Sequence, residues 1–546
     1  MNQSGFAILG MILLAQGAFA EVVGIDGLGP DDIAGLRVSH DFWGLDRGRN
    51  RAVFRLSGDQ RERLEQLGYS IETDLERQAE LDRWRSLDHR AQLLGDAESV
   101  PGFACYRSVA KTHADLDALA AAFPTRSQWR RIGDSWQAGG SIFALVLANQ
   151  ASPQPKAPVV IMAAQHAREL ATAEIATRLA ELLLQNPDRD PDIDWLLDHR
   201  EIHIIAQQNP DGRRQVEQGQ SLWRKNHNES ACTSGDLSSS WPGIDLNRNS
   251  SFLWGDDAAS SGSSCSQIYR GPVTASEPET QAVQNYLAGI FAVQRPGAGL
   301  DDPAPIDAEG LFISLHSFGE LVLLPWEGRA TGNENNAPNH DALTILGRRF
   351  GFLTGYEVSR WQSLGPASGT MVDYAYGEFG VAAYTFEVGT RFTESCASFE
   401  STVWPASRRA LLLAIKAGRR PYQRPAGPEI TALQAVFENG VPRLAGSADD
   451  TRYFRGNVSE PPAADPVSNI VEFRVSLGLP EHLADQSFVF PVAEPAEAVS
   501  FDVSLPPGAA LPANGRLFVT AVDAQGQVGL ARVVTVGNAI FNDGFE

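Results

Sequence analysis

The sequence predicts an α/β domain followed by a β-sandwich. Between about Gly102 and Gln423, apolar runs typical of buried strands alternate with helical patterns. The proline-rich stretch Arg420–Glu429 ends this pattern, and beyond it apolar residues recur at every second position. Strands interleaved with helices favour a sheet covered on both faces, whereas alternating strands favour a sandwich.

A chain of 546 residues has room for three or four domains at about 150 residues each. We divide it into these segments: a signal peptide (1–20), a propeptide-like segment (21–101), the α/β domain (102–423), a linker (424–428), a β-sandwich of immunoglobulin or fibronectin type (429–537) and a tail (538–546).

The first twenty residues resemble a secretory signal peptide. Their apolar core, Phe6–Leu14, precedes Ala18-Phe19-Ala20, although no lysine or arginine comes before the core. The alternative is a buried N-terminal strand. No other stretch is apolar for long enough to span a bilayer. We therefore expect a protein that is secreted or periplasmic.

The next segment is highly charged. Gly58–Gly68 and Glu72–Arg90 have helical patterns. Two interpretations stay open: a solvated helical linker, or a propeptide cut among the arginines of 83–90.

The α/β domain has four apolar runs that predict strands and one long amphipathic helix. The strands are Ala157–Ala164, Glu201–Ala206, Leu311–His316 and Val381–Glu387, and the helix is Ala171–Gln185. In the C-terminal region, Val471–Val475 and Val499–Leu505 alternate in the manner of strands, and Arg516–Val536 predicts a hairpin.

The formal net charge is −22. Such a chain repels nucleic acid and anionic membranes, so we expect neither as a partner, and we expect a monomer. The four cysteines lack the Cys-x-x-Cys spacing of a thiolate zinc site. An even number in an exported chain predicts two disulfides, with three pairings open.

A metal site is suggested by His166 and Glu169, which are three residues apart and so share one face of a turn or helix. Imidazole with carboxylate suits zinc, and catalytic zinc takes three protein ligands. His316 ends a predicted strand and is the candidate third ligand. Taken singly, these residues also fit a solvated helix start and a strand-end histidine.

Glu387 closes an apolar strand, where a carboxylate is costly to bury unless it is paired or used. Beside a metal it suits a general base. Arg224 and the pair Asn247-Arg248 suit the grip of a carboxylate or an oxyanion. Each residue also has an alternative without a catalytic role: Glu387 could be a salt-bridged carboxylate of the core, and the arginine segments could be surface charge.

Together these segments resemble the zinc carboxypeptidase family of the pancreatic A and B type, over about Cys105–Tyr422. Seven motifs occur in family order: HARE, NPDG, LWRKN, DLNRN, LHSFGELVLLPW, GPASGTMVDYAYG and YTFEVGT. The resemblance implies an α/β/α sandwich with a mixed, mostly parallel sheet. It also implies one zinc ion per chain, bound by His166, Glu169 and His316.

The resemblance further assigns roles around the metal. It implies that Glu387 takes a proton from the zinc-activated water and passes it to the leaving amine, and that Arg224 polarises the scissile carbonyl. Asn247 and Arg248 hold the terminal carboxylate of the substrate, and Arg168 belongs to a subsite wall. The disulfides implied are Cys232–Cys265 and Cys105–Cys396.

The sequence departs from the family at Gly365, where relatives have a tyrosine that closes over the substrate. Trp361 is a candidate substitute for it. In the specificity pocket, Val372 matches an apolar floor position and Glu327 a position that is acidic in relatives cutting after basic residues; Leu323, Ala367 and Thr385 match other lining positions. The prediction is therefore mixed specificity.

The function predicted is that of a secreted zinc metallocarboxypeptidase acting on the C-termini of peptides or proteins. One alternative keeps the metal site but acts on cell-wall peptides or N-acyl amino acids. Another is a catalytically impaired peptide-binding protein. The carboxylate at Glu387 argues against the last, because binding needs no general base.

Overall fold

The computed structural model describes most of the chain, namely residues 20–46, 49–87, 98–186, 190–230, 232, 242–255, 259–297, 299–328, 336–360, 364–438, 441–454, 466–484, 486–509 and 515–535. The predicted signal peptide up to residue 19, the tail 538–546 and Trp361 lie outside these ranges. Within them, no helix has the length and apolar character needed to cross a membrane.

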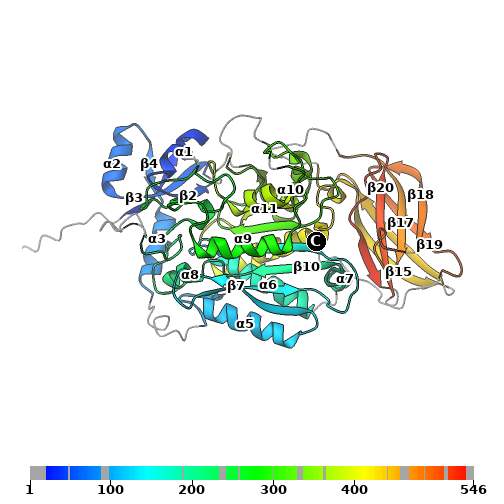
Figure 1. Ribbon diagram of the computed structural model, residues 1–546. Helices are drawn as coiled ribbons and strands as arrows, with labels where there is room; N and C mark the ends of the chain where they lie inside the picture. The colour runs from blue at the N-terminus through cyan, green and yellow to red at the C-terminus, as the bar shows by residue number, and fades with distance from the viewer. Residues whose placement is uncertain are drawn as a thin grey trace, which may run out of the picture.

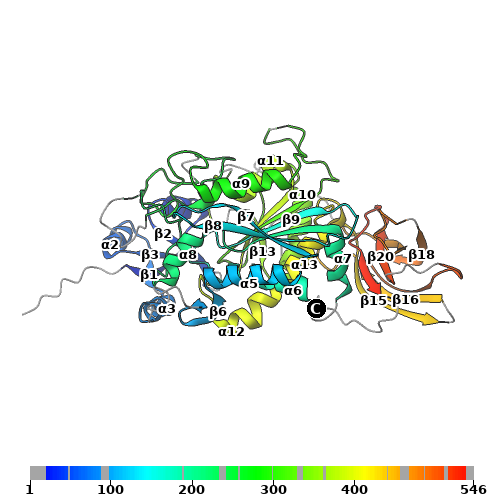
Figure 2. The ribbon, with the colours of Figure 1, turned by 60° about the horizontal axis from the view of Figure 1, so that its bottom comes forward.

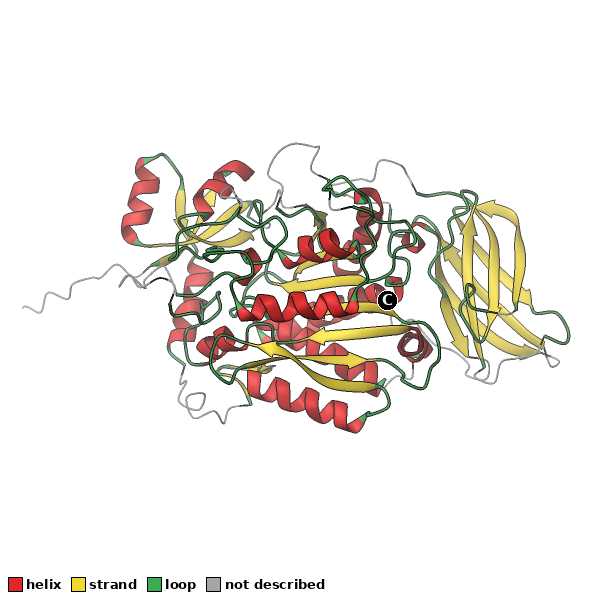
Figure 3. Cartoon of the chain, in the orientation of Figure 1, coloured by secondary structure: helices red, strands yellow, loops and turns green. Residues whose placement is uncertain are grey.

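Three units follow one another along the chain (Figure 1). A small α/β unit lies at one end, a large α/β domain forms the middle and a β-sandwich lies at the other end (Figure 3).

The N-terminal unit is a four-stranded antiparallel sheet in the order β2-β3-β1-β4. Its elements are β1 (Glu21–Asp26), α1 (Pro30–Arg37), β2 (Asp41–Asp46), β3 (Arg51–Leu56), α2 (Gly58–Gln66), β4 (Ile71–Thr73) and α3 (Leu75–Arg85). The two predicted helices are present as α2 and α3. The linker interpretation is wrong, because the segment folds into a sheet whose strands the sequence did not reveal.

Both faces of this small sheet are covered. Val23 and Phe54 face α1 and α2 in one apolar cluster. Their neighbours Val22 and Val53 point the other way and form a cluster with Phe318 and other residues of the large domain. Alternation along each strand thus produces two apolar faces, and the second is buried partly by Leu81 of α3 and partly by docking on the large domain.

The large domain is built on an eight-stranded sheet in the order β13-β12-β14-β11-β9-β10-β8-β7. Its elements are β5 (Ser99–Val100), β6 (Phe103–Arg107), α5 (Val109–Ala122), β7 (Ser127–Asp134), β8 (Ser141–Leu147), β9 (Ala157–Met162), α6 (Leu170–Gln185), α7 (Pro191–His199), β10 (Arg200–Ile205), α8 (Pro210–Glu217), η1 (Leu246–Arg248), α9 (Pro278–Ile290), β11 (Leu311–His316), β12 (Leu321–Leu323), α10 (His340–Thr354), β13 (Glu357–Ser359), α11 (Met371–Phe379), β14 (Ala382–Glu387), α12 (Cys396–Ser398), η4 (Phe399–Val403), α13 (Trp404–Ala417) and η5 (Arg424–Ala426).

The centre of the sheet is parallel and fully covered. Strands β10, β9, β11 and β14 run parallel to one another, while β12 pairs antiparallel with β14 and β8 with β10. Helices α9 and α11 lie on one face, and α5, α6 and α13 on the other (Figure 2). Double coverage explains why the central strands are continuous apolar runs. The three-layer α/β/α fold and the four predicted strands, β9, β10, β11 and β14, are confirmed.

Both predicted disulfides are present. Cys105–Cys396 joins the two ends of the large domain across 291 residues, and Cys232–Cys265 closes the segment of chain that contains η1. Cross-links restrict the unfolded chain and so favour the folded state.

The C-terminal unit is a sandwich of two sheets, β15-β16-β19 and β18-β17-β20-β21. Its strands are β15 (Glu429–Glu438), β16 (Val441–Asp449), β17 (Ile470–Leu477), β18 (Ser487–Ala496), β19 (Ala498–Ser504), β20 (Arg516–Asp523) and β21 (Arg532–Thr535). The predicted hairpin is the antiparallel pair β20 and β21. The sandwich packs on the large domain, with the Phe518 ring 5.6 Å from that of Trp195.

Candidate metal centre and active site

The predicted site residues meet at the carboxyl ends of three adjacent parallel strands. His166 follows β9, His316 is the last residue of β11 and Glu387 is the last residue of β14. His316 and Glu387 are register partners. Open α/β sheets place their ligands at this edge, so the strand order by itself brings together residues from three distant segments.

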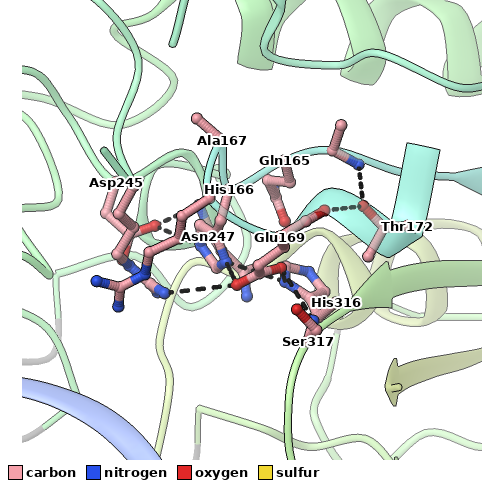
Figure 4. A network of polar contacts seen from close by, with 12 residues as sticks. Gln165, His166, Ala167, Glu169, Thr172, Asp245, Asn247, His316 and Ser317 are labelled. Carbon is pink, nitrogen blue, oxygen red and sulfur yellow. Dashed lines mark hydrogen bonds and ion pairs between the residues drawn. The ribbon is translucent and has the colours of Figure 1, made fainter. Parts of the chain in front are cut away.

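His166, Glu169 and His316 form a compact buried group of metal donors. One donor atom from each lies within 4.8 Å of the others. His166 Nδ1 is 2.8 Å from Glu169 Oε1 and 3.0 Å from His316 Nδ1, as Figure 4 shows. Although burial opposes it, the nearby His166 and His316 imidazoles hold the pKa of Glu169 well below its usual range.

Local structure directs Glu169 into the site rather than onto its own helix. It is the N-cap residue of α6, yet its side chain makes no capping hydrogen bond. The Thr172 hydroxyl donates to the Glu169 carbonyl, and the Ala164 amide donates to that hydroxyl. Glu169 Oε2 accepts from the Ser317 amide at 3.1 Å. The solvated helix start is therefore excluded for this residue.

Asp245 is a functional residue that the sequence analysis did not single out. It lies in the DLNRN motif, and its Oδ1 is 3.0 Å from His166 Nε2. Its Oδ2 accepts from Arg224 Nη2 at 2.9 Å. The DLNRN motif marks this segment as part of the site. Nothing in the sequence shows that the Asp245 carboxylate faces a histidine 79 positions earlier.

The donor set fits a zinc ion. When Nε2–H of His166 donates to Asp245, Nδ1 is left unprotonated and turned toward Glu169. His316 has the same arrangement, with its Nε2 3.0 Å from the Ser314 hydroxyl. Two imidazoles and a carboxylate, with the other ring nitrogens bonded outward, are a donor set of catalytic zinc.

Glu387 lies beside the metal donors at the wall of the cleft. Burial raises its pKa to about 8, an effect that His316 opposes and Glu169 reinforces. A divalent cation held by the donor group favours the ionised carboxylate and lowers this pKa. Glu387 therefore has the position of a general base, and its pKa responds to a bound cation in the way that this role requires.

Arginines line the same cleft. Arg224 is held by Asp245 through Nε and Nη2, with Nη1 3.9 Å from Glu169 Oε1. Arg248 follows on η1, where its Nε donates to the Ala259 carbonyl at 3.0 Å. Burial lowers the pKa of Arg248 to about 10, which leaves it charged at neutral pH. Asn247 lines the cleft next to it.

The N-terminal unit reaches into this cleft. Its residues Arg37, His40, Phe42, Trp43 and Gly44 line the space together with the metal donors His166 and Glu169. The sequence pattern of residues 21–101 does not indicate this contact.

Several polar contacts join the N-terminal unit to the large domain, among them Arg391 with Glu80 on α3 at 2.8 Å. Asp41 accepts from Arg168 Nη1 at 3.2 Å, and both residues are buried. Arg37 Nη1 donates to the carbonyls of Leu364 and Gly365. Gly365 has a φ of +77°, and a Cβ there would lie 2.8 Å from Arg37 Nη1. Arg37 thus occupies the space beside the position at which the family resemblance leads us to expect a tyrosine.

The specificity residues are placed differently from one another. Glu327 lines the cleft with Leu323, Ala367 and Thr385. Val372, on α11, is buried and is not among the residues lining the cleft. Burial raises the pKa of Glu327, and its Oε1 has no hydrogen-bond partner in the part of the chain that the structure describes.

Fold and site together are those of an α/β protein with a group that could hold a metal ion at the carboxyl edge of its mixed sheet, an arrangement typical of metallohydrolases. Comparison with known families identifies it further. The sequence model of the family described as zinc carboxypeptidase matches residues 112–403. The chain belongs to the zinc carboxypeptidase family.

Curated relatives bear related names. The chain is 27% identical over 293 residues to "Metallocarboxypeptidase A" of Arthroderma otae, covering 54% of this chain and 62% of that one. It is 26% identical to "Zinc carboxypeptidase A 1" of Drosophila melanogaster, covering 60% and 72%. It is 27% identical to "Carboxypeptidase A1" of Sus scrofa, covering 53% and 64%. The match thus spans less than two thirds of the fungal and porcine proteins.

Solved structures share the fold. Carboxypeptidase A from Helicoverpa armigera superposes with a TM-score of 0.57 at 24% identity, covering 74% of this chain and 98% of that one. Thrombin-activatable fibrinolysis inhibitor superposes with a TM-score of 0.55 at 18% identity, with the same coverage.

Proposed function

We propose that this chain is an exported zinc metallocarboxypeptidase that removes single residues from the C-termini of peptides. One observation carries the proposal: the donor group His166, Glu169 and His316, the carboxylate of Glu387 and the cation of Arg224 converge on one cleft. Family membership supports the same activity.

The roles of the residues follow from their positions. When bound, zinc supplies a Lewis acid that activates water and polarises the scissile carbonyl. Arg248 and Asn247 hold the terminal carboxylate of the peptide by charge-assisted hydrogen bonds. Arg224 stabilises the negative charge that develops on the carbonyl oxygen. Glu387 accepts a proton from the attacking water and returns it to the departing amine.

Removal of the metal tests the activity. We expect a zinc chelator to abolish the loss of single residues from peptides ending in Phe, Leu, Lys, Arg, Glu or D-Ala, as followed by mass spectrometry. Added zinc should restore it. Peptides with amidated C-termini are the matched control, since they lack the carboxylate that Arg248 binds. If zinc-loaded protein freed of its N-terminal unit leaves every peptide intact, the peptidase proposal fails and peptide binding becomes the better account.

We also propose that the N-terminal unit is an inhibitory propeptide. Arg37 and Trp43 line the cleft beside Glu387 and Arg224, where the end of a substrate must enter. The sheet face that docks here buries Val22, Val53 and further apolar residues against the large domain. This apolar contact holds the unit over the cleft, and cutting the connection to the large domain allows the unit to dissociate. Export agrees with the two disulfides, which persist in oxidising compartments.

The cleft supports a preference for basic C-terminal residues. Glu327 presents a buried Oε1 that makes no hydrogen bond with the described residues. It lies next to Asp373, whose pKa is raised well above its usual range by burial and by Glu327. A lysine or arginine side chain of the substrate would supply the missing donor and neutralise this pair. The apolar Val372 is excluded from the lining.

The substitution Glu327→Gln tests this preference. It removes the charge but keeps the shape, so we expect kcat/KM for a peptide ending in Arg to fall by roughly 10- to 100-fold relative to one ending in Phe, because a hydrogen bond to a charged group contributes about 1.5–3 kcal/mol. Glu378→Gln, on the exposed side of α11, is the matched control. If the ratio of kcat/KM for the two peptides is unchanged, Glu327 does not contribute to recognition of the C-terminal side chain of the substrate.

A further inference from the structure

A recess rich in cations lies where the β-sandwich meets the large domain. It measures about 500 Å³, including space open to solvent. The large domain contributes residues around the end of α13, and the sandwich contributes the segments after β17 and before β21. The charged side chains in its lining are Arg200, Lys416, Arg419, Arg420, Arg424 and Glu481, and the imidazole of His482 lies among them.

Two of these cations, Lys416 and Arg200, have partners within the protein. Lys416 Nζ is 2.9 Å from the Asp192 carboxylate. Arg200 donates to the carbonyls of Ile415 and Lys416 near the C-terminus of α13 and to that of His199. The negative end of a helix explains why a cation is buried here, and these two side chains require no ligand.

Arg419 and Arg424 are not satisfied in this way. Arg419 is only 8% exposed, and its Nη1 has no hydrogen-bond partner among the described residues. Its Nε is 3.5 Å from Glu309. Within the described part of the chain Arg424 Nη1 also makes no hydrogen bond, and it lies 3.6 Å from Glu481. The other oxygen of Glu481 is bound by Arg474 at 2.6 Å, so this one carboxylate serves two guanidinium groups.

The recess therefore carries excess positive charge within a chain whose net charge is −22. The pKa of His482 is consistent with this excess of positive charge. It is lowered to about 4 by burial and by the nearby cations Arg419, Arg424, Arg200 and Arg420. Buried cations without full pairing are costly. A bound anion would remove that cost.

We propose that this recess binds a small tetrahedral oxyanion, phosphate or sulfate, between Arg419, Arg424 and His482. The planar fork of each guanidinium presents paired N–H donors to such an anion. His482 remains neutral at pH 7, so one ring nitrogen can add a donor. The anion would link η5 and the end of α13 to the sandwich, and so stabilise the contact between the two units. This site is independent of the catalytic cleft.

Thermal unfolding of the full chain tests the proposal. We expect the midpoint to rise by a few degrees in millimolar phosphate at pH 7 compared with chloride at equal ionic strength, because a ligand that binds only the folded state shifts unfolding by mass action. Titration calorimetry should give a dissociation constant of about 1 mM or tighter. Parallel runs with sulfate distinguish the two oxyanions, and runs with acetate test for a planar carboxylate.

The substitutions Arg419→Gln and Arg424→Gln should each abolish the phosphate-dependent shift and the calorimetric signal. Arg63→Gln, on the exposed face of α2, changes the net charge equally and should leave both unchanged. If one of the two substitutions prevents folding, the other still decides. A shift that is equal in chloride or larger in acetate, or that survives both substitutions, overturns the oxyanion site.

Discussion

Replacing Glu387 with glutamine is expected to lower kcat/KM by about 10²- to 10⁴-fold, the contribution typical of a general acid–base group. The substitution preserves the shape of the side chain and removes only its ability to accept a proton. The loss should appear mainly in kcat, since proton transfer is part of the transition state rather than of binding. Hydrolysis of blocked peptides ending in Arg or Phe, with protein freed of its N-terminal unit, provides the measurement.

Zinc content distinguishes this role from a structural one. Glu387 is not a member of the donor group His166, Glu169 and His316, so the glutamine variant should retain one zinc per chain by mass spectrometry of the metal. Glu378→Gln is again the matched control and should retain full activity. A Glu387→Gln protein that keeps its zinc and loses less than about threefold in kcat/KM would remove Glu387 from the catalytic step, since general acid–base groups contribute far more.

The central sheet and the metal donors could be predicted because their signals are local. Strands β9, β11 and β14 are buried on both faces and so are continuous apolar runs, and His316 and Glu387 stand at the ends of such runs. Which strands lie side by side is not a local property. Here the resemblance to a family, based on the order of its motifs, predicted a mostly parallel sheet. The parallel pairing of β11 with β14 agrees with that prediction.

The N-terminal sheet left no comparable local signal. Its central strand β1 pairs with β3 and β4, which follow later in the chain, and β3 carries arginines at both its start and its fifth position. A short strand with charged residues does not alternate clearly enough to predict a sheet. The burial of those arginines depends on acidic partners elsewhere, as with Arg51 and Asp74 at 3.0 Å.

Polar contacts between residues far apart in the chain could not be predicted from the sequence either. Arg37 meets the backbone at Gly365 from 328 positions away, and Asp245 meets His166 across another large separation. At Gly365 the sequence showed only that the family's tyrosine is missing. The structure adds that a cation from the N-terminal unit lies next to that position.

That contact leads to the second large effect we expect. Cutting the chain between α3 and β5 at an introduced protease site, and separating the N-terminal unit, should raise kcat/KM by roughly 10- to 1,000-fold. The range follows from an open, binding-competent state that is populated at about 0.1–10% when a few kcal/mol favour the docked state. Activity before and after cutting, and after removal of the released unit by size-exclusion chromatography, gives the ratio directly.

Point substitutions in the uncut chain separate occlusion from a simple effect of cutting. Arg37→Ala removes the contact with Leu364 and Gly365, and Asp41→Asn weakens the buried pair with Arg168. Each should raise the activity of the intact chain by a smaller factor than removal of the unit, because the apolar face around Val22 and Val53 still docks. Arg63→Gln, on α2, should have no effect. If the separated large domain is folded, binds zinc and is no more active than the intact chain, the N-terminal unit is a permanent part of the enzyme, and Arg37 becomes a candidate substitute for the missing tyrosine.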